Sequence, residues 1–261
     1  MKGYTKDLHI HTYYSDGSSS PYEAVKWAVD GGMTEIAITD HDNVNGVPAA
    51  YSAAKQLGVK FHTGIEFSTE EAGIGLHILG YDIDIDNKLL LEKCEEISLM
   101  RARRNDKMIT LLQQKFEINR EDILKMTPTG YIGKPVMARA LVAKGCIPQE
   151  GYAFEHIFGE PEFRKLKKEK ISAREAVAII NGAGGKAVLA HPGLIRGLGQ
   201  RESEEFFSNF QVLLDRIKSY GLEGLECIYR KHSEYEDEKF ENIAKEANLL
   251  VTIGSDYHGN Y

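Results

Sequence analysis

Two histidines near the start of the chain are spaced so that they could bind a metal ion. His9 and His11 lie in the segment TKDLHIH (5–11), whose alternation is typical of a short β-strand. Side chains two positions apart in a strand face the same side, and Asp16 follows in the next loop. Because a His-x-His pair often occupies a strand face without any metal, the pair alone is weak evidence.

Further imidazole and carboxylate side chains lie in or at the ends of the later predicted strands. Six of the nine histidines belong to this pattern. In α/β barrels the carboxyl ends of the strands carry the chemistry, and burying so many ionisable groups without a compensating partner would be costly. Separately buried histidines and capping aspartates are therefore the less favoured interpretation. The pattern comprises His9, His11, Asp16, Asp40, His41, Glu66, His77, His191, Asp256 and His258.

This mixture of donors indicates a site for more than one transition-metal ion. Imidazole and carboxylate ligands suit Zn²⁺, Mn²⁺ or Fe²⁺ better than Ca²⁺ or Mg²⁺. The donors outnumber the positions around one ion, and they would suffice for two or three divalent ions if one carboxylate bridges. Glu66 is the expected bridge, because a carboxylate offers two oxygens. Clustered divalent ions favour hydrolysis, since they lower the pKa of bound water and clamp a phosphoryl group.

Alternating strands and helices would position these side chains. Ser20 and Glu23 predict a capping box at the start of one helix, and Ser172 and Glu175 predict another. Strands joined by crossover helices suggest an α/β fold, with parallel strands in a (β/α)₇-type barrel. An open doubly wound sheet is the alternative. The predicted strands are 5–11, 34–40, 59–68, 75–84, 186–193, 222–229 and 249–256.

The alternation is interrupted in the middle of the chain. Residues 87–170 read as helical, with a long helix from Leu89 and a shorter one near 134–144. We therefore expect a barrel made of residues 1–86 and 171–261, with 87–170 as a helical insertion domain that caps the substrate.

Length, composition and charge limit the class of protein. The 261 residues contain 42% hydrophobic residues, enough for a sizeable core, but no apolar run long enough to span a membrane. The N-terminus lacks the apolar core of a signal peptide, and Cys94, Cys146 and Cys227 are too widely spaced for a disulfide framework. We therefore expect a cytoplasmic protein, and the sequence indicates no membrane or obligate protein partner. The net charge of −7 disfavours a broad nucleic-acid surface.

Several other features favour ordinary structural roles. GAGGK (182–186) lacks the Ser or Thr of a phosphate loop, so a helix end before a strand is expected. The basic segments RARR (101–104) and FRKLKKEK (163–170) could contact nucleic-acid phosphates, but solvated charged faces are commoner. Tyr13 and Tyr14 could stack on a base or simply pack. His62, His156 and His232 fit no ligand position and are expected to be structural or exposed.

The motifs LHIHTYYSDG, TDHD, GIEF, HILGY, AHP and GSDYHG together resemble the PHP (polymerase and histidinol phosphatase) family. The resemblance implies a distorted seven-stranded barrel with a trinuclear metal centre. It also implies catalytic roles for His191 and for Asp40, the latter by orienting a liganding histidine, although a strand-end cap is comparably plausible for Asp40. The implied metal ligands are His9, His11, Asp16, His41, Glu66, His77, His191, Asp256 and His258.

The helical block resembles one subgroup, the stand-alone 3′,5′-nucleotide bisphosphate phosphatases and 5′→3′ exoribonucleases. In GKPVMARALVAKGC (133–146) the resemblance implies phosphate contacts by Lys134 and Arg139, and Arg196 could also reach a phosphate. The sequence has Lys134 where the subgroup has arginine, and it lacks a histidine near Val136. The implied substrate is a nucleotide bisphosphate or a short 5′-phosphorylated RNA or DNA end. A histidinol-phosphate phosphatase, a C–N hydrolase and a non-enzymatic metal-binding module are the alternatives.

Overall fold

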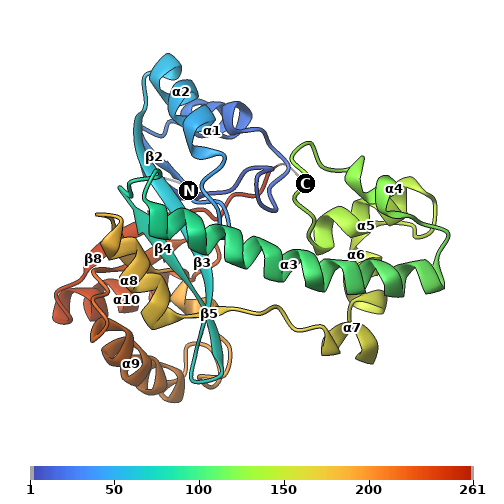
Figure 1. Ribbon diagram of the computed structural model, residues 1–261. Helices are drawn as coiled ribbons and strands as arrows, with labels where there is room; N and C mark the ends of the chain where they lie inside the picture. Colours follow the sequence, from blue (N-terminus) through green and yellow to red (C-terminus); the bar gives the residue numbers. More distant parts are fainter. Residues whose placement is uncertain (1–2, 260–261) are drawn as a thin grey trace.

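The computed structural model describes residues 3–259 and contains one mixed sheet that closes almost completely on itself (Figure 1). A parallel bridge between Ile10 and Tyr257 joins the first strand to the segment after the last. The predicted distorted barrel is therefore confirmed, and the open sheet is excluded. The strands follow the order β1 (Lys6–Ile10), β2 (Glu35–Ile38), β3 (Lys60–Glu71), β4 (Ile74–Tyr81), β6 (Lys186–Leu189), β7 (Gly224–Tyr229) and β8 (Leu250–Gly254), and the short β5 (Ile171–Ser172) pairs with β3.

The expectation of parallel strands throughout is wrong for β4. This strand runs antiparallel to both β3 and β6. Only Ala72 and Gly73 separate β3 from β4, and both have positive φ, 50° and 81°. Two residues close a hairpin but cannot form a crossover helix, so the reversal of direction follows from the length of this connection.

Five helices surround the barrel and bury their apolar faces on it. The predicted capping box of Ser20 and Glu23 is present. At Ser172 only half of the expected box forms, because the Glu175 carboxylate binds Lys93 instead. The helices are α1 (Pro21–Asp30), α2 (Val47–Leu57), α8 (Ala173–Gly182), α9 (Glu204–Lys218) and α10 (Glu234–Glu246).

Between β4 and β5 the chain forms a helical part with a hydrophobic cluster of its own, which includes Met108, Leu112, Met137 and Phe163. Helix α3 has 28 residues, about 42 Å at 1.5 Å per residue, and it runs from the barrel to the far side of this part (Figure 1). A long connection leads back from α7 to β5. The elements are α3 (Lys88–Lys115), α4 (Arg120–Leu124), α5 (Lys134–Ala143), α6 (Glu150–Tyr152), the π-helix η1 (Ala153–Ile157) and α7 (Pro161–Lys165).

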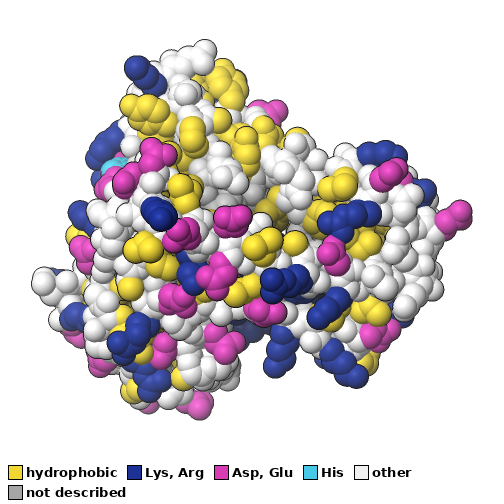
Figure 2. All heavy atoms as spheres, viewed as in Figure 1, with side chains coloured by type: hydrophobic (Ala, Val, Ile, Leu, Met, Phe, Trp, Pro, Cys, Tyr) yellow, Lys and Arg dark blue, Asp and Glu magenta, His cyan; other side chains and the backbone are white. Residues whose placement is uncertain are grey.

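Charges of both signs are interspersed on the face of the molecule in Figure 2. This mixture agrees with the modest net charge of −7 and leaves no broad basic surface on the visible face. Within residues 3–259, no helix is long and apolar enough to cross a membrane.

Candidate metal centre

The first pair of candidate ligands occupies the end of β1. His9 and His11 are both fully buried, and their Nε2 atoms are 3.1 Å apart. The strand geometry predicted from their spacing therefore brings the two rings together inside the barrel.

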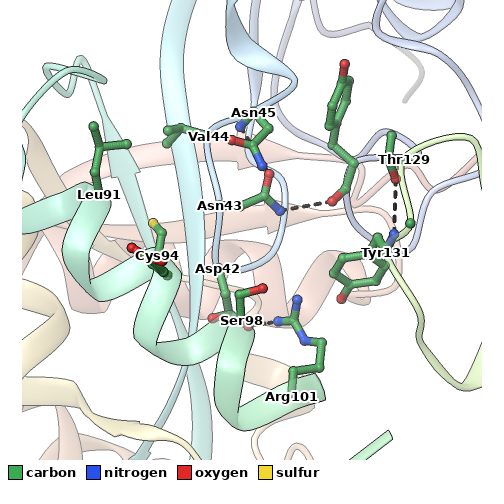
Figure 3. A pocket seen from close by; sticks show the side chains of 13 residues that line it. Asp42, Asn43, Val44, Asn45, Leu91, Cys94, Ser98, Arg101, Thr129 and Tyr131 are labelled. Atoms are coloured by element: carbon green, nitrogen blue, oxygen red, sulfur yellow. Dashed lines mark hydrogen bonds and ion pairs between the residues drawn. The ribbon is translucent and has the colours of Figure 1, made fainter. Parts of the chain in front are cut away.

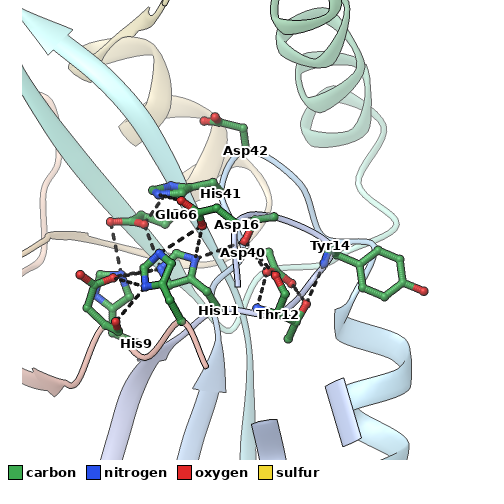
Figure 4. A network of polar contacts seen from close by, with 12 residues as sticks. His9, His11, Thr12, Tyr14, Asp16, Asp40, His41, Asp42 and Glu66 are labelled. Carbon is green, nitrogen blue, oxygen red and sulfur yellow. Dashed lines mark hydrogen bonds and ion pairs between the residues drawn. The ribbon is translucent and has the colours of Figure 1, made fainter. Parts of the chain in front are cut away.

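Glu66, on β3, lies at the centre of the constellation with no exposed surface. Its two oxygens face different imidazoles, and Figure 4 shows the carboxylate among the rings of the first two strands. This arrangement suits a bridging carboxylate. Oε1 lies 2.8 Å from His77 Nδ1, 3.1 Å from His191 Nε2 and 3.3 Å from His9 Nε2, whereas Oε2 lies 2.9 Å from His41 Nδ1 and 3.3 Å from His11 Nε2.

Two aspartates complete the set on the other side of His11. Asp256 Oδ1 is 3.3 Å from His11 Nε2, and its other oxygen accepts a 2.8 Å hydrogen bond from the Tyr229 hydroxyl. Asp16 Oδ1 is 3.1 Å from His258 Nε2. The hydroxyl of Tyr229 therefore fixes which oxygen of Asp256 faces the histidines.

All nine predicted ligands come together in overlapping groups whose potential ligand atoms lie within 4.8 Å of one another. Glu66 Oε2 and His41 Nδ1 are 2.9 Å apart, yet neither atom makes a hydrogen bond. Buried acceptor atoms that converge in this way fit a cation between them. The groups are His11, Asp16, His41 and His258; His9, His11 and Asp256; His9, Glu66 and His191; and His41, Glu66 and His77.

Burial and close charges shift the acidities of this site. Burial alone raises the pKa of Glu66, but the imidazoles around it, His41 first, outweigh burial and hold that pKa well below its usual value. Burial alone lowers the pKa of His11, but Asp256 and Glu66 outweigh it and raise that pKa to about 10. For His77 burial dominates and lowers the pKa to about 4. The carboxylates are thus ionised and ready to bind cations, and His77 is neutral at pH 7.

Glu226 is a further residue of the site that the sequence pattern did not identify. This buried carboxylate accepts hydrogen bonds from His9 Nδ1 at 2.9 Å and from the backbone N–H of His191 at 2.7 Å. The first bond leaves His9 Nε2 free to bind a metal. The second holds His191 in its left-handed conformation, with φ of 27°. The available signal was an acidic residue in the middle of the strand GLECIY, which has no other charged side chain.

Asp40 belongs to none of the candidate ligand groups and contacts the residues beside them. Its oxygens accept hydrogen bonds from the backbone N–H and the hydroxyl of Thr12, both at 2.7 Å, and from the Ser15 hydroxyl at 2.6 Å. Ser15 Oγ in turn lies 3.3 Å from His11 Nδ1. Asp40 therefore orders the loop after β1 and reaches a candidate ligand only through Ser15.

Asp42 connects the metal centre to the helical part. Its backbone N–H donates to the Glu66 carbonyl at 2.9 Å, and its carboxylate, which is fully buried, accepts from Arg101 of α3 and from Lys168. Figure 3 shows Arg101 reaching from α3 towards Asp42. The expected solvated faces of RARR and FRKLKKEK are therefore wrong for these two cations. Arg104 is also engaged, donating to the Leu166 carbonyl at 2.8 Å.

The three residues expected to contact phosphate occupy different surroundings. Arg196 lines a cavity of about 320 Å³ together with His77, His191 and Lys170. Arg139 lines a second cavity, about 220 Å³, beside the Ser15–Ser18 loop, and its Nη1 is buried without a hydrogen-bond partner in the described chain. Lys134 lines neither cavity.

The Lys134 ammonium instead packs over the Phe158 ring at 5.2 Å. Burial, and then the nearby charge of Arg104, lower the pKa of Lys134. The structure thus places Arg196 and Arg139 at cavity walls and Lys134 against an aromatic ring of the helical part.

The remaining histidines lie outside the constellation, as expected. His62 contacts Glu35 and Asp82, His232 is buried and lies 3.1 Å from the Cys227 carbonyl, and His156 is exposed.

GAGGK contains the end of α8 and the first residue of β6, which confirms its structural interpretation.

The family model that matches this chain is the PHP domain, over residues 7–223. A 5′-3′ exoribonuclease of Haemophilus influenzae is 30% identical, with 97% of this chain and 89% of the relative aligned. A 3′,5′-nucleoside bisphosphate phosphatase of Chromobacterium violaceum is 30% identical, with 97% and 86% aligned. A phosphoribosyl 1,2-cyclic phosphate 1,2-diphosphodiesterase of Eggerthella lenta is 28% identical, with 98% and 95% aligned.

Two solved structures share the whole architecture. One, described as an amidohydrolase from Chromobacterium violaceum with bound sulfate and no metal, has a TM-score of 0.85 and 28% identity, covering 98% of this chain and 88% of its own. The other, described as a putative metal-dependent phosphoesterase from Bifidobacterium adolescentis, has a TM-score of 0.84 and 31% identity, with 97% and 87% covered. The barrel and the helical part are therefore both common to these proteins.

Proposed function

The chain belongs to the PHP domain family, and from this premise we propose that it is a metal-dependent phosphoesterase acting on phosphate esters of nucleotides. The observation that carries the proposal is the buried carboxylate of Glu66, whose two oxygens face five imidazoles. A hydrolase built on clustered divalent ions needs such a shared ligand. The named relatives, which are phosphatases, phosphodiesterases or exoribonucleases, support the same reaction class.

The site would hold two or three divalent ions, with Mn²⁺, Fe²⁺ and Zn²⁺ all compatible with imidazole and carboxylate donors. The four overlapping donor groups described above are the residues that would hold them. When bound, such ions lower the pKa of water and neutralise the charge on phosphoryl oxygens. Glu226 and Tyr229 would hold His9 and Asp256 in the orientation required for binding.

Cations of the chain would bind the part of the substrate outside the metal centre. Arg196 lines the cavity that His77 and His191 share, and the unpartnered Nη1 of Arg139 lies in the cavity beside the Ser15–Ser18 loop. A guanidinium with no carboxylate partner suits a phosphate. We therefore favour substrates with two phosphates, such as nucleoside 3′,5′-bisphosphates, or the 5′-phosphorylated end of a short RNA or DNA. In this proposal residues 87–170 cap the substrate.

Phosphate release tests this function. Purified protein loaded with Mn²⁺ is expected to release phosphate from adenosine 3′,5′-bisphosphate or from 5′-phosphorylated oligonucleotides, and more slowly from histidinol phosphate. His9→Asn and His191→Asn should abolish release while circular dichroism stays unchanged, and His156→Asn, at an exposed position, is the matched control. Full activity of either site variant would refute the assignment. Metal binding without any hydrolysis would favour a non-enzymatic module.

A further inference from the structure

A cavity of about 400 Å³ lies between the barrel and α3. Its barrel wall is the segment Asp42–Asn45, which directly follows His41, and its other walls come from α3 and from the loop around Tyr131 (Figure 3). This volume falls within the range of small-molecule sites. The cavity is therefore large enough for a small molecule. One of its walls starts at Asp42, the residue that follows the candidate metal ligand His41.

The walls of this cavity combine apolar and aromatic side chains with polar ones. Val44, Leu91 and Cys94 form one side. On the other side the Arg101 guanidinium stacks on the Tyr131 ring, with Cζ 4.6 Å from the ring centre. Flat aromatic and guanidinium surfaces are what bases stack on in nucleotide sites.

The cavity offers no uncompensated positive charge for a phosphate. Its one basic residue, Arg101, is paired with the Asp42 carboxylate, and the acidic Glu95 also lines the cavity. By contrast, neither Arg196 nor Lys170, in the cavity next to His77, has a carboxylate partner in the described chain. The charges of the lining residues therefore favour phosphate in the cavity with Arg196 and Lys170, and an uncharged group in the cavity beside Asp42–Asn45.

We propose that the cavity between Asp42–Asn45 and α3 binds the nucleobase of the substrate. This inference rests on the proposed function and adds a specificity to it, because a base-free sugar phosphate would leave the cavity empty. The distinction matters within the family, since one relative is named for a nucleoside bisphosphate and another for a phosphoribosyl cyclic phosphate.

Stacking is the contact by which this cavity would recognise a base. The Asn43 amide is already occupied, because its nitrogen donates to the carbonyls of Tyr14 and His41, and its oxygen accepts from the Asn45 backbone N–H. The Asn43 amide is therefore not available to a base edge, whereas the Arg101 and Tyr131 surfaces offer stacking, which tolerates any base.

Calorimetry of the metal-free protein with AMP and with ribose 5-phosphate tests the proposal. AMP should bind at least about tenfold more tightly, because stacking of one base commonly contributes this much. Ser98→Phe should remove the difference, since the exposed Ser98 side chain lines the cavity. Leu99→Phe is the matched control, because Leu99 is 53% exposed on the same helix and does not line the cavity.

Equal affinities for the two probes, or an unchanged advantage for AMP in Ser98→Phe, would overturn the base site. The ratio of kcat/KM for adenosine 3′,5′-bisphosphate over ribose 3,5-bisphosphate in the Mn²⁺-loaded enzyme provides a second readout, with the same expected response to Ser98→Phe. If the loaded enzyme hydrolyses neither ester while AMP still binds better than ribose 5-phosphate, the proposed function fails and the base site stands.

Discussion

Glu226 accepts a hydrogen bond from His9 Nδ1 at 2.9 Å, and both side chains are completely buried. Because this bond places the proton of the neutral ring on Nδ1, it leaves Nε2 to face Glu66. A residue from β7 thus determines how a candidate metal ligand on β1 presents its lone pair.

Glu226→Gln should weaken metal binding with the fold retained. The two hydrogen bonds go to different oxygens of Glu226, so in glutamine either His9 Nδ1 or the backbone N–H of His191 would face an NH2 group instead of an acceptor. Loss of such a supporting contact typically costs about 10–100-fold in metal affinity. Competition with a chelator, followed by elemental analysis, measures the loss. Glu223→Gln, at an exposed position three residues earlier, is the control, and equal affinities in the two variants would contradict the assigned role.

Asp42→Asn should loosen the helical part from the barrel. The substitution leaves Arg101 and Lys168 without their shared carboxylate, a change that we expect to cost about 2 kcal/mol of unfolding free energy. Hydrogen exchange should increase first in α3 and in the connection 166–170. Asp86→Asn, at an exposed position before α3, controls for the loss of one negative charge. Unchanged exchange in α3 would show that this ion pair does not fasten the two parts.

Metal binding should release protons at pH 7 and become tighter as the pH rises. An imidazole must be neutral to bind a metal, but contacts with Asp256 and Glu66 outweigh burial and raise the pKa of His11 to about 10. The metal-free ring is therefore protonated at pH 7, and the ion must displace that proton. His77, with its pKa lowered by burial to about 4, has none to release. Calorimetry in buffers of different ionisation enthalpy counts the protons, and a heat independent of buffer would contradict this assignment.

Glu35→Gln should lower the melting temperature at neutral pH but not in strong acid. Burial alone raises the pKa of Glu35, but hydrogen bonds from Lys6, Lys60 and His62 outweigh it and lower that pKa to about 2. A lowered pKa in the folded state stabilises the protein above the ordinary value of 4.5, and this contribution is lost as the pH falls through about 2.

Since solvent screens part of this network, we expect a decrease of about 2–4 °C at pH 7. The difference between Glu35→Gln and wild type should shrink steadily in melting curves recorded from pH 5 down to pH 2. Glu92→Gln, which removes an exposed carboxylate 3.7 Å from Lys88, should have little effect at either pH. A constant difference across this range would rule out Glu35 ionisation as its cause.

The sequence predicted the barrel and the gathering of the nine candidate ligands because both depend on local patterns. Strand periodicity and turns locate the strands, and barrel closure brings their ends together. Glu66 and His77 lie on the two arms of a hairpin, so they meet although β4 runs against the predicted direction. Here the hydrophobic pattern located the strand but did not reveal its orientation.

The residues that the sequence did not identify depend on contacts between distant segments. Arg101 and Asp42 are 59 positions apart, and their pairing depends on the path of α3 past the barrel, which helical periodicity does not determine. RARR therefore resembled an ordinary charged surface. The partner of Glu175 is similarly distant, because Lys93 of α3 replaces the expected local contact with Ser172.

The continuity of α3 restricts how the helical part can change in length. Inserting one residue between its cap at Asn87 and Arg101 would rotate everything beyond the insertion by about 100° and advance it by about 1.5 Å. Arg101 would then turn away from Asp42, and the wall of the 400 Å³ cavity would turn with it. This stretch of helix therefore works as a fixed spacer, and related chains should vary in length beyond it, in the loops between α3 and α7.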